Sequence, residues 1–288
     1  MTRRLAFITA FVLWTTLVVG CRGPQAQPVP TPTPTQLSAA PAAGPVSELR
    51  PELERHFPKA KGAFVLYDLN DKRYSRYNPE RCATSFLPAS TFKIMNSLAG
   101  LEAGVIPDEN HVIPWDGTRY AIEAWNRDHT LKTAIQNSVV WYYQELARQV
   151  GKEKMQAYLE EAGYGNKDVS GQIDTFWLEG GVRISADEQV EFLKRLYQGE
   201  LPFSTRSVAV VKDILVLEEG DAYRFSGKTG SAQRVQPHTG WFVGYLEREG
   251  NVYFFATNFE STDPNGLANG ETAKKITRSI LRDMGLLP

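Results

Sequence analysis

A serine and a lysine stand three residues apart at the start of a predicted helix, in the segment Pro88-Ala89-Ser90-Thr91-Phe92-Lys93. Residues at positions i and i+3 of a helix lie on one face, so the Ser90 hydroxyl and the Lys93 amine are within reach of each other. The lysine can serve as the base of a nucleophilic serine, and backbone N–H groups at the helix start can stabilise an oxyanion. The alternative is a Ser90 that only caps the helix and a Lys93 on the surface.

Two further motifs supply a second hydroxyl and a second cation. Ser138 precedes Val139 in an apolar stretch that we predict to be helical, and a buried hydroxyl needs a hydrogen-bond partner. It can relay a proton, or it can bond back to a carbonyl of its own helix. Lys228-Thr229-Gly230 ends a predicted strand, where the glycine permits close backbone approach and the cation suits a substrate carboxylate.

The elements that must position these groups alternate between strands and helices. The chain opens with a predicted hairpin, continues through helices, and returns to strands before a last helix. Strand patterns cover 62–69, 73–77, 224–230, 241–247 and 252–259, and helix patterns cover 91–102, 131–149, 153–161, 185–197 and 272–284. This order predicts an α+β fold: a central antiparallel sheet formed by both chain ends, flanked by helices, with an all-helical middle region.

The composition excludes several classes of function. The 288 residues include 32 Lys and Arg against 33 Asp and Glu, so no summed positive field can hold a nucleic acid backbone. With four His, two Cys and no paired ligand spacing, the chain offers no zinc site. We therefore expect no nucleic acid partner and no metal. A Ser-His-Asp triad is disfavoured because no G-x-S-x-G motif is present, which leaves surface or capping roles for His56, His111, His129 and His238.

The first 45 residues are predicted to lie outside the folded domain. Residues 1–21 combine two arginines, an apolar run and a terminal Gly20-Cys21, which is typical of a signal peptide. Val18-Val19-Gly20-Cys21 resembles the lipobox of bacterial lipoproteins, which implies that Cys21 is lipidated; an ordinary signal or an uncleaved span are the alternatives. Residues 22–45 hold seven of the 17 prolines and predict a disordered tether, which leaves 46–288 as the catalytic domain and Cys82 as a small buried residue.

Together the motifs resemble those of the serine penicillin-recognising superfamily, which carries S-x-x-K and K-T-G elements. Tyr164-Gly165-Asn166, Phe176-Trp177-Leu178-Glu179-Gly180 and Gly240-Trp241-Phe242-Val243-Gly244 are similar to motifs of the class D β-lactamases, the oxacillinases. The resemblance covers 46–288. It implies a β-lactamase/transpeptidase-like fold and an enzyme that hydrolyses the amide of penicillins and other β-lactams, which confers antibiotic resistance.

In this family the motif lysine, here Lys93, reacts with carbon dioxide to form a carbamate that acts as general base. No other cofactor is implied. Only a neutral amine can react, so the resemblance requires a buried lysine whose pKa is lowered from about 10.4. Donors to the carbamate are expected from Ser90 and from the indole of Trp177. The apolar residues that we place around the carbamate are Phe92, Val139, Trp177 and Leu178.

The resemblance also implies roles in substrate binding. Ser90 forms the acyl-enzyme, the backbone N–H groups of Ser90 and Ser231 hold the oxyanion, and Ser138 passes a proton to the ring nitrogen. Lys228 and Thr229 orient the substrate carboxylate. The sequence departs from many relatives near Asn269-Gly270, where an arginine that grips the carboxylate is absent. Arg234 or Lys274 is the candidate substitute.

Two rival functions share this site. One is a non-hydrolytic penicillin-binding receptor domain, and the other is a D,D-peptidase, for which a dry pocket around Trp177 is not expected. The expected partners are β-lactam antibiotics, with membrane contact only through a lipid anchor on Cys21. The protein is then exported to the bacterial periplasm, and its oligomeric state is not predicted.

Overall fold

The computed structural model describes residues 46–262 and 268–288. The chain divides into a unit of residues 1–42 and a unit of residues 43–288. The predicted signal peptide, the tether and Cys21 lie outside the described residues, so their assignments stay predictions. Among the helices of the described ranges, none has both the length and the apolar character needed to span a bilayer.

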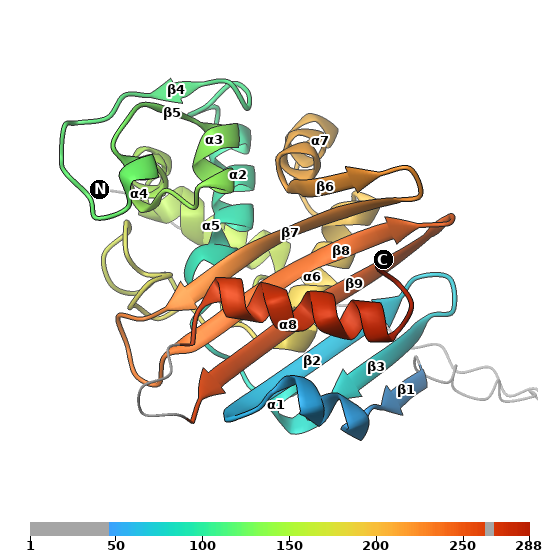
Figure 1. The fold of residues 1–288 in the computed structure, drawn as a ribbon. Helices are drawn as coiled ribbons and strands as arrows, with labels where there is room; N and C mark the ends of the chain where they lie inside the picture. The colour runs from blue at the N-terminus through green and yellow to red at the C-terminus, as the bar shows by residue number, and fades with distance from the viewer. Residues whose placement is uncertain (1–45, 263–267) are drawn as a thin grey trace, which may run out of the picture. The chain divides into compact units, whose positions relative to one another are not determined.

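A seven-stranded sheet with strand order β1-β3-β2-β9-β8-β7-β6 forms the centre of the second unit (Figure 1). Strand β2 from the start of the chain pairs antiparallel with β9 from its end, so both chain ends complete one sheet, as predicted. Neighbouring strands are antiparallel except for β1 and β3, which are parallel. The prediction missed β1 because four residues carry too little periodicity. The strands are β1 Val46–Leu49, β2 Ala60–Asp68, β3 Arg73–Tyr77, β6 Val216–Gly220, β7 Tyr223–Ala232, β8 Thr239–Arg248 and β9 Asn251–Ser261.

Helices cover both faces of the sheet, and successive strand residues alternate between two cores. On one face α8 (Gly270–Asp283) lies across β7, β8 and β9 and buries side chains such as Phe64 and Phe255 (Figure 1). On the other face α6 (Ala186–Gln198) packs on β2 and β9. The larger core continues from there into the helical region.

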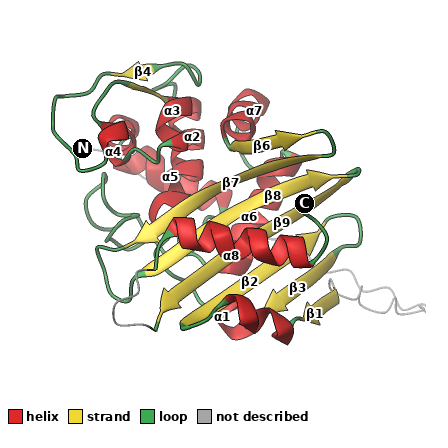
Figure 2. Ribbon diagram, in the orientation of Figure 1, coloured by secondary structure: helices red, strands yellow, loops and turns green. Residues whose placement is uncertain are grey.

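The helical region lies beside one end of β7 (Figure 2). Its order from β3 to β6 confirms the predicted all-helical middle, apart from the two-stranded ribbon of β4 and β5. The remaining elements are η1 Pro51–His56, α1 Pro79–Ala83, η2 Ala89–Phe92, α2 Lys93–Glu102, β4 Val112–Ile113, η3 Glu123–Trp125, β5 His129–Thr130, α3 Leu131–Gln136, α4 Val140–Val150, α5 Lys152–Ala162 and α7 Thr205–Ile214.

The prediction of one helix over 131–149 is wrong at its centre. The chain leaves α3 at Asn137, and Val139 N donates to Ala134 O at 2.9 Å, which closes the helix. Ser138 between them has a φ of 52°, a left-handed conformation that ends an α-helix. Ser138 therefore lies in a turn between α3 and α4 and is not a helical serine bonded to its own i−4 carbonyl.

The buried free thiol of Cys82 confirms its predicted role as a small core residue.

Candidate active site

The nucleophile candidate and its base lie at the junction of η2 and α2. Ser90 belongs to η2 and Lys93 is the first residue of α2. Their side chains meet, with 2.6 Å between Lys93 Nζ and Ser90 Oγ. Lys93 has no solvent-exposed surface, which rules out a surface lysine. The predicted one-face geometry of the pair is present.

A chain of hydrogen bonds joins four side chains from three parts of the sequence. Lys93 Nζ lies 3.2 Å from Ser138 Oγ and donates to Ser138 O at 3.1 Å. Lys228 Nζ donates to the same Ser138 Oγ at 2.9 Å and to Thr229 O at 2.9 Å. Ser138 Oγ therefore stands between two amines. The left-handed turn places it there, and this arrangement can pass a proton between the groups.

Burial makes the neutral forms of both lysines accessible. Desolvation holds the pKa of Lys93 well below its usual range, and the nearby charge of Lys228 lowers it further. Desolvation also lowers the pKa of Lys228 to about 7, with Glu271 opposing this shift and Lys274 adding to it. A neutral Lys93 amine is a nucleophile toward CO₂, as the expected chemistry requires.

The residues predicted to surround the Lys93 amine are buried in the structure. Phe92 and Trp177 are fully buried and stack with ring centroids 5.5 Å apart, and Val139 is fully buried beside Ser138. The Trp177 indole Nε1 is buried and has no acceptor among the described residues. An unpaired buried donor calls for an explanation. A carboxyl group on Lys93 fits this pocket because it supplies an acceptor that the uncarboxylated chain lacks.

A cavity of about 550 Å³ opens in front of this cluster. The lining residues do not include the buried side chains of Lys93, Lys228, Phe92, Val139 and Trp177. The predicted site residues that line the cavity are Ser90, Ser138, Leu178, Thr229, Ser231 and Arg234.

The sequence analysis missed much of the apolar wall of this cavity. Tyr120 and Ile122 come from the long connection between α2 and α3, and Val140 begins α4. Trp125 lines the same wall. Ile122 is 49% exposed, and its sequence neighbours Ala121 and Glu123 give no signal of this position.

The end of the cavity at Asn269 and Gly270 is closely packed. A Cβ on Gly270 would lie 2.6 Å from Thr229 Cβ and 2.8 Å from Gly230 N. Gly270 N also donates to Ser231 Oγ at 2.9 Å. The start of α8 is thus packed directly on β7, and no side chain fits at position 270 without displacing the backbone.

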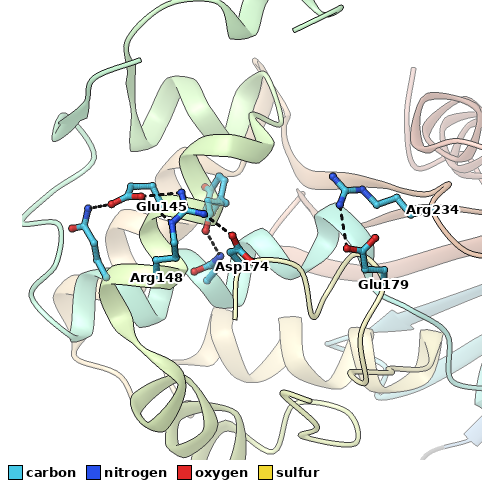
Figure 3. Close-up of polar contacts among 8 residues, drawn as sticks. Glu145, Arg148, Asp174, Glu179 and Arg234 are labelled. Carbon is cyan, nitrogen blue, oxygen red and sulfur yellow. Dashed lines mark hydrogen bonds and ion pairs between the residues drawn. The ribbon is translucent and has the colours of Figure 1, made fainter. Parts of the chain in front are cut away.

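Arg234 is the cation that lines this end of the cavity, whereas Lys274 does not line it. Arg234 Nη1 forms an ion pair with Glu179 Oε1 at 3.5 Å, as Figure 3 shows, and both side chains are about half exposed. The sequence analysis did not identify Glu179 as this partner, because 55 residues separate the two.

The segment that carries Trp177 is held by ion pairs on both sides (Figure 3). Before Trp177, Asp174 accepts from Arg148 Nη1 of α4 at 2.6 Å, and Glu145 accepts from the same guanidinium. After it, Glu179 pairs with Arg234. These contacts restrain the segment on both sides of Trp177.

The Tyr-Gly-Asn motif has a structural role. Tyr164 is fully buried against Phe92, with ring centroids 5.5 Å apart. Asn166 Nδ2 donates to Gly181 O, and its Oδ1 accepts from Arg183 N, which fixes the end of the Trp177 segment.

Within residues 46–262 and 268–288, no group of three His, Cys, Asp or Glu side chains could hold a metal ion.

Several known proteins are similar to this chain in sequence and fold. Residues 61–282 match the family model of the penicillin-binding protein transpeptidase domain. The chain is 44% identical over 230 residues to β-lactamase OXA-48 of Klebsiella pneumoniae, which covers 80% of this chain and 86% of that protein. A class D β-lactamase structure from Nostoc superposes with a TM-score of 0.77 and 45% identity, over 82% of this chain and 99% of that one. The C-terminal domain of the Bacillus licheniformis BlaR penicillin receptor gives a TM-score of 0.80 and 36% identity, over 85% and 99% of the two chains.

Proposed function

This chain belongs to the class D serine β-lactamases, and we propose that it hydrolyses the amide of penicillins through an acyl-enzyme on Ser90 with a carboxylated Lys93 as general base. The observation that carries the proposal is the fully buried Lys93 amine at 2.6 Å from Ser90 Oγ. Opening the β-lactam ring destroys the antibiotic, so this activity confers resistance.

In acylation, Ser90 Oγ attacks the β-lactam carbonyl and the carbonyl oxygen becomes an oxyanion. We assign the stabilisation of this oxyanion to the backbone N–H groups of Ser90 and Ser231, which both line the cavity. Electrostatic stabilisation of this kind is usually the largest contribution to such a reaction. The ring nitrogen leaves and must receive a proton, which Ser138 Oγ donates.

Lys228 acts on this proton transfer from behind Ser138. Its Nζ donates to Ser138 Oγ at 2.9 Å, so a protonated Lys228 replaces the proton that the hydroxyl gives up. A lysine with a pKa near 7 is suited to this task at neutral pH. Thr229 contacts the substrate carboxylate, and Lys228 contributes to carboxylate binding through its charge.

Bound as a carbamate on Lys93 Nζ, carbon dioxide supplies a general base for acylation and for activation of the hydrolytic water. Trp177 Nε1 and Ser90 Oγ donate hydrogen bonds to this group. Phe92, Val139 and Leu178 exclude bulk water from it. Exclusion of water keeps the Lys93 amine neutral before it reacts and strengthens the hydrogen bonds afterwards.

Arg234 binds the substrate carboxylate in place of the arginine that many relatives carry near position 270. It lines the cavity together with Thr229 and Ser231, and its guanidinium already holds one carboxylate, that of Glu179. Two carboxylates can share a guanidinium because it has five donors. Arg234→Ala should raise KM for a penicillin more than it lowers kcat.

Stopped-flow turnover of a chromogenic cephalosporin tests the proposed function. A β-lactamase gives steady-state hydrolysis with many turnovers per active site. A burst of one equivalent without further turnover would contradict hydrolysis and favour the penicillin receptor or the D,D-peptidase. The similarity to the BlaR receptor domain makes this control necessary.

We further propose export to the periplasm and membrane attachment through a lipid on Cys21. The support is the signal pattern of residues 1–21 and the lipobox-like sequence that ends at Cys21. Wild-type protein should incorporate labelled palmitate and sediment with membranes, whereas Cys21→Ser should do neither. Unlabelled wild-type protein in the periplasmic fraction would contradict the anchor.

A further inference from the structure

We propose that Thr91 and Gln189 are positioning residues that set the spacing between the two oxyanion donors, the backbone N–H groups of Ser90 and Ser231. The inference rests on the proposed function, because it concerns the stabilisation of the acylation oxyanion. Neither side chain lines the substrate cavity. Thr91 is 1% exposed and Gln189 has no exposed surface, so both act from behind the nucleophile.

The backbone that presents Ser90 N is in a conformation that needs support. Ala89, the residue before the nucleophile, has a φ of 48°. An L-residue with a side chain rarely adopts this left-handed region, and such a residue persists only when its surroundings hold it. The orientation of the Ser90 N–H group depends directly on this residue.

A buried hydrogen-bond chain supplies that support. Thr91 Oγ1 donates to Pro88 O at 2.8 Å, and Gln189 Nε2 donates to Thr91 Oγ1 at 2.9 Å. The two bonds clamp the turn from Pro88 to Thr91 around Ala89. Gln189 is a firm anchor because α6 begins with a capping box at Ser185 and is tied to the nucleophile segment by the paired backbones of Phe86 and Ile184.

The same atoms contact the strand that carries the second donor. A Cβ on Gly230 would lie 3.0 Å from Pro88 O and 3.0 Å from Thr91 Cγ2. The backbone of β7 therefore rests on the carbonyl and the methyl group that the hydrogen-bond chain fixes. Ser231 follows Gly230 directly, so a shift of Pro88 or Thr91 changes the distance between the two N–H groups.

A second contact from β8 fixes the segment on its other side. Trp241 Nε1 donates to Leu87 O at 3.0 Å, and Trp241 pairs with Gly230 across β7 and β8. With Leu87 held to the sheet and Thr91 held to α6, the turn that presents Ser90 N is fixed at both ends. Thr91 and Gln189 then set the distance between this turn and β7.

The variant Thr91→Val tests this role because it keeps the size and shape of the side chain and removes both hydrogen bonds. Thr277→Val is the matched control: Thr277 is fully buried on α8, and its hydroxyl likewise donates to a backbone carbonyl, that of Ala273, at 2.9 Å. We expect Thr91→Val to lower the single-turnover acylation rate by about 10- to 100-fold, since small displacements of oxyanion donors have effects of this order. Non-covalent binding of the penicillin should change less than about twofold.

An infrared measurement distinguishes positioning of the oxyanion donors from a contribution to the stability of the fold alone. With a penicillin carrying ¹³C at its β-lactam carbonyl, stopped-flow infrared spectra report the hydrogen bonds to the acyl oxygen. Thr91→Val should move the acyl carbonyl band to higher wavenumber, whereas Thr277→Val should leave both the band and the acylation rate unchanged. Thr91→Ser keeps the hydroxyl and should restore most of the rate.

Gln189→Met gives the same test without altering the nucleophile segment. The acylation rate should fall at least threefold, and the acyl carbonyl band should shift less than in Thr91→Val. Folded Thr91→Val or Gln189→Met enzyme with an unshifted band and the acylation rate of Thr277→Val would overturn the inference. If wild-type enzyme forms no acyl-enzyme at all, the proposed function fails and this inference fails with it. If wild-type enzyme is acylated normally and both variants keep the wild-type acylation rate and carbonyl band, this inference alone is overturned.

Discussion

Removal of the Trp177 N–H group should weaken carboxylation of Lys93 without disturbing the free enzyme. Trp177→Phe keeps an aromatic ring stacked on Phe92 and deletes a donor that has no acceptor among the described residues. The free enzyme therefore loses no hydrogen bond, and the loss falls on the carboxylated form. A hydrogen bond to a charged group contributes about 1.5–3 kcal/mol, which corresponds to a change of about 10- to 150-fold in the affinity for CO₂.

The assay is penicillin hydrolysis as a function of added bicarbonate in CO₂-depleted buffer. The half-saturating bicarbonate concentration should rise by that factor in Trp177→Phe, and saturating bicarbonate should restore most of the activity. Trp141→Phe is the control, because its buried indole already has an acceptor in Trp125 O, at 2.9 Å. A folded Trp177→Phe enzyme whose half-saturating concentration stays within twofold of wild type would refute the assigned role of the indole.

Other predictions concern the groups around this pair. Ser90→Ala should form no covalent adduct with penicillin, and an adduct mass on the intact protein would contradict the assigned nucleophile. Ser138→Ala should lower kcat/KM by about 100-fold or more, since it removes the proton relay; an unchanged pH–rate profile would argue against that role. Burial lowers the pKa of Lys228 to about 7, whereas an unfolded lysine titrates near 10.4, so the unfolded state binds more protons between these values. This lysine should therefore raise the free energy of unfolding with pH, by about 0.7 kcal/mol per pH unit at pH 7 and about 1.4 kcal/mol per pH unit near pH 8.5. Urea titrations of Lys228→Met in bicarbonate-free buffer should show a flatter pH dependence than wild type.

Local spacing made the centre of the site predictable from the sequence. The pair Ser90 and Lys93 lies within one helical turn, so helix geometry alone places the two side chains together. The sheet was predictable because β8 and β9 are short runs rich in aromatic and β-branched residues, and the capping box at Ser185 marked the start of α6. The motif resemblance then related these segments to one fold.

The parts that the sequence did not reveal depend on tertiary contacts. The turn at Ser138 interrupts a continuous helical pattern, because Val139 N bonds to Ala134 O and the serine takes a left-handed conformation. No periodicity signals such a break. The packing of Gly270 on β7 leaves no room for a side chain at position 270, and only the fold brings α8 against Thr229. The ion pair between Arg234 and Glu179 likewise joins segments that spacing does not relate.

The central claim is that the Lys93 amine is dry and neutral enough to carry CO₂ beside Ser90. ¹³C NMR of the enzyme in ¹³C-labelled bicarbonate measures this directly. The account predicts one carbamate resonance that disappears in Lys93→Ala and whose intensity follows penicillin turnover as bicarbonate is withdrawn and restored. Full turnover in bicarbonate-free buffer without a carbamate resonance would contradict it.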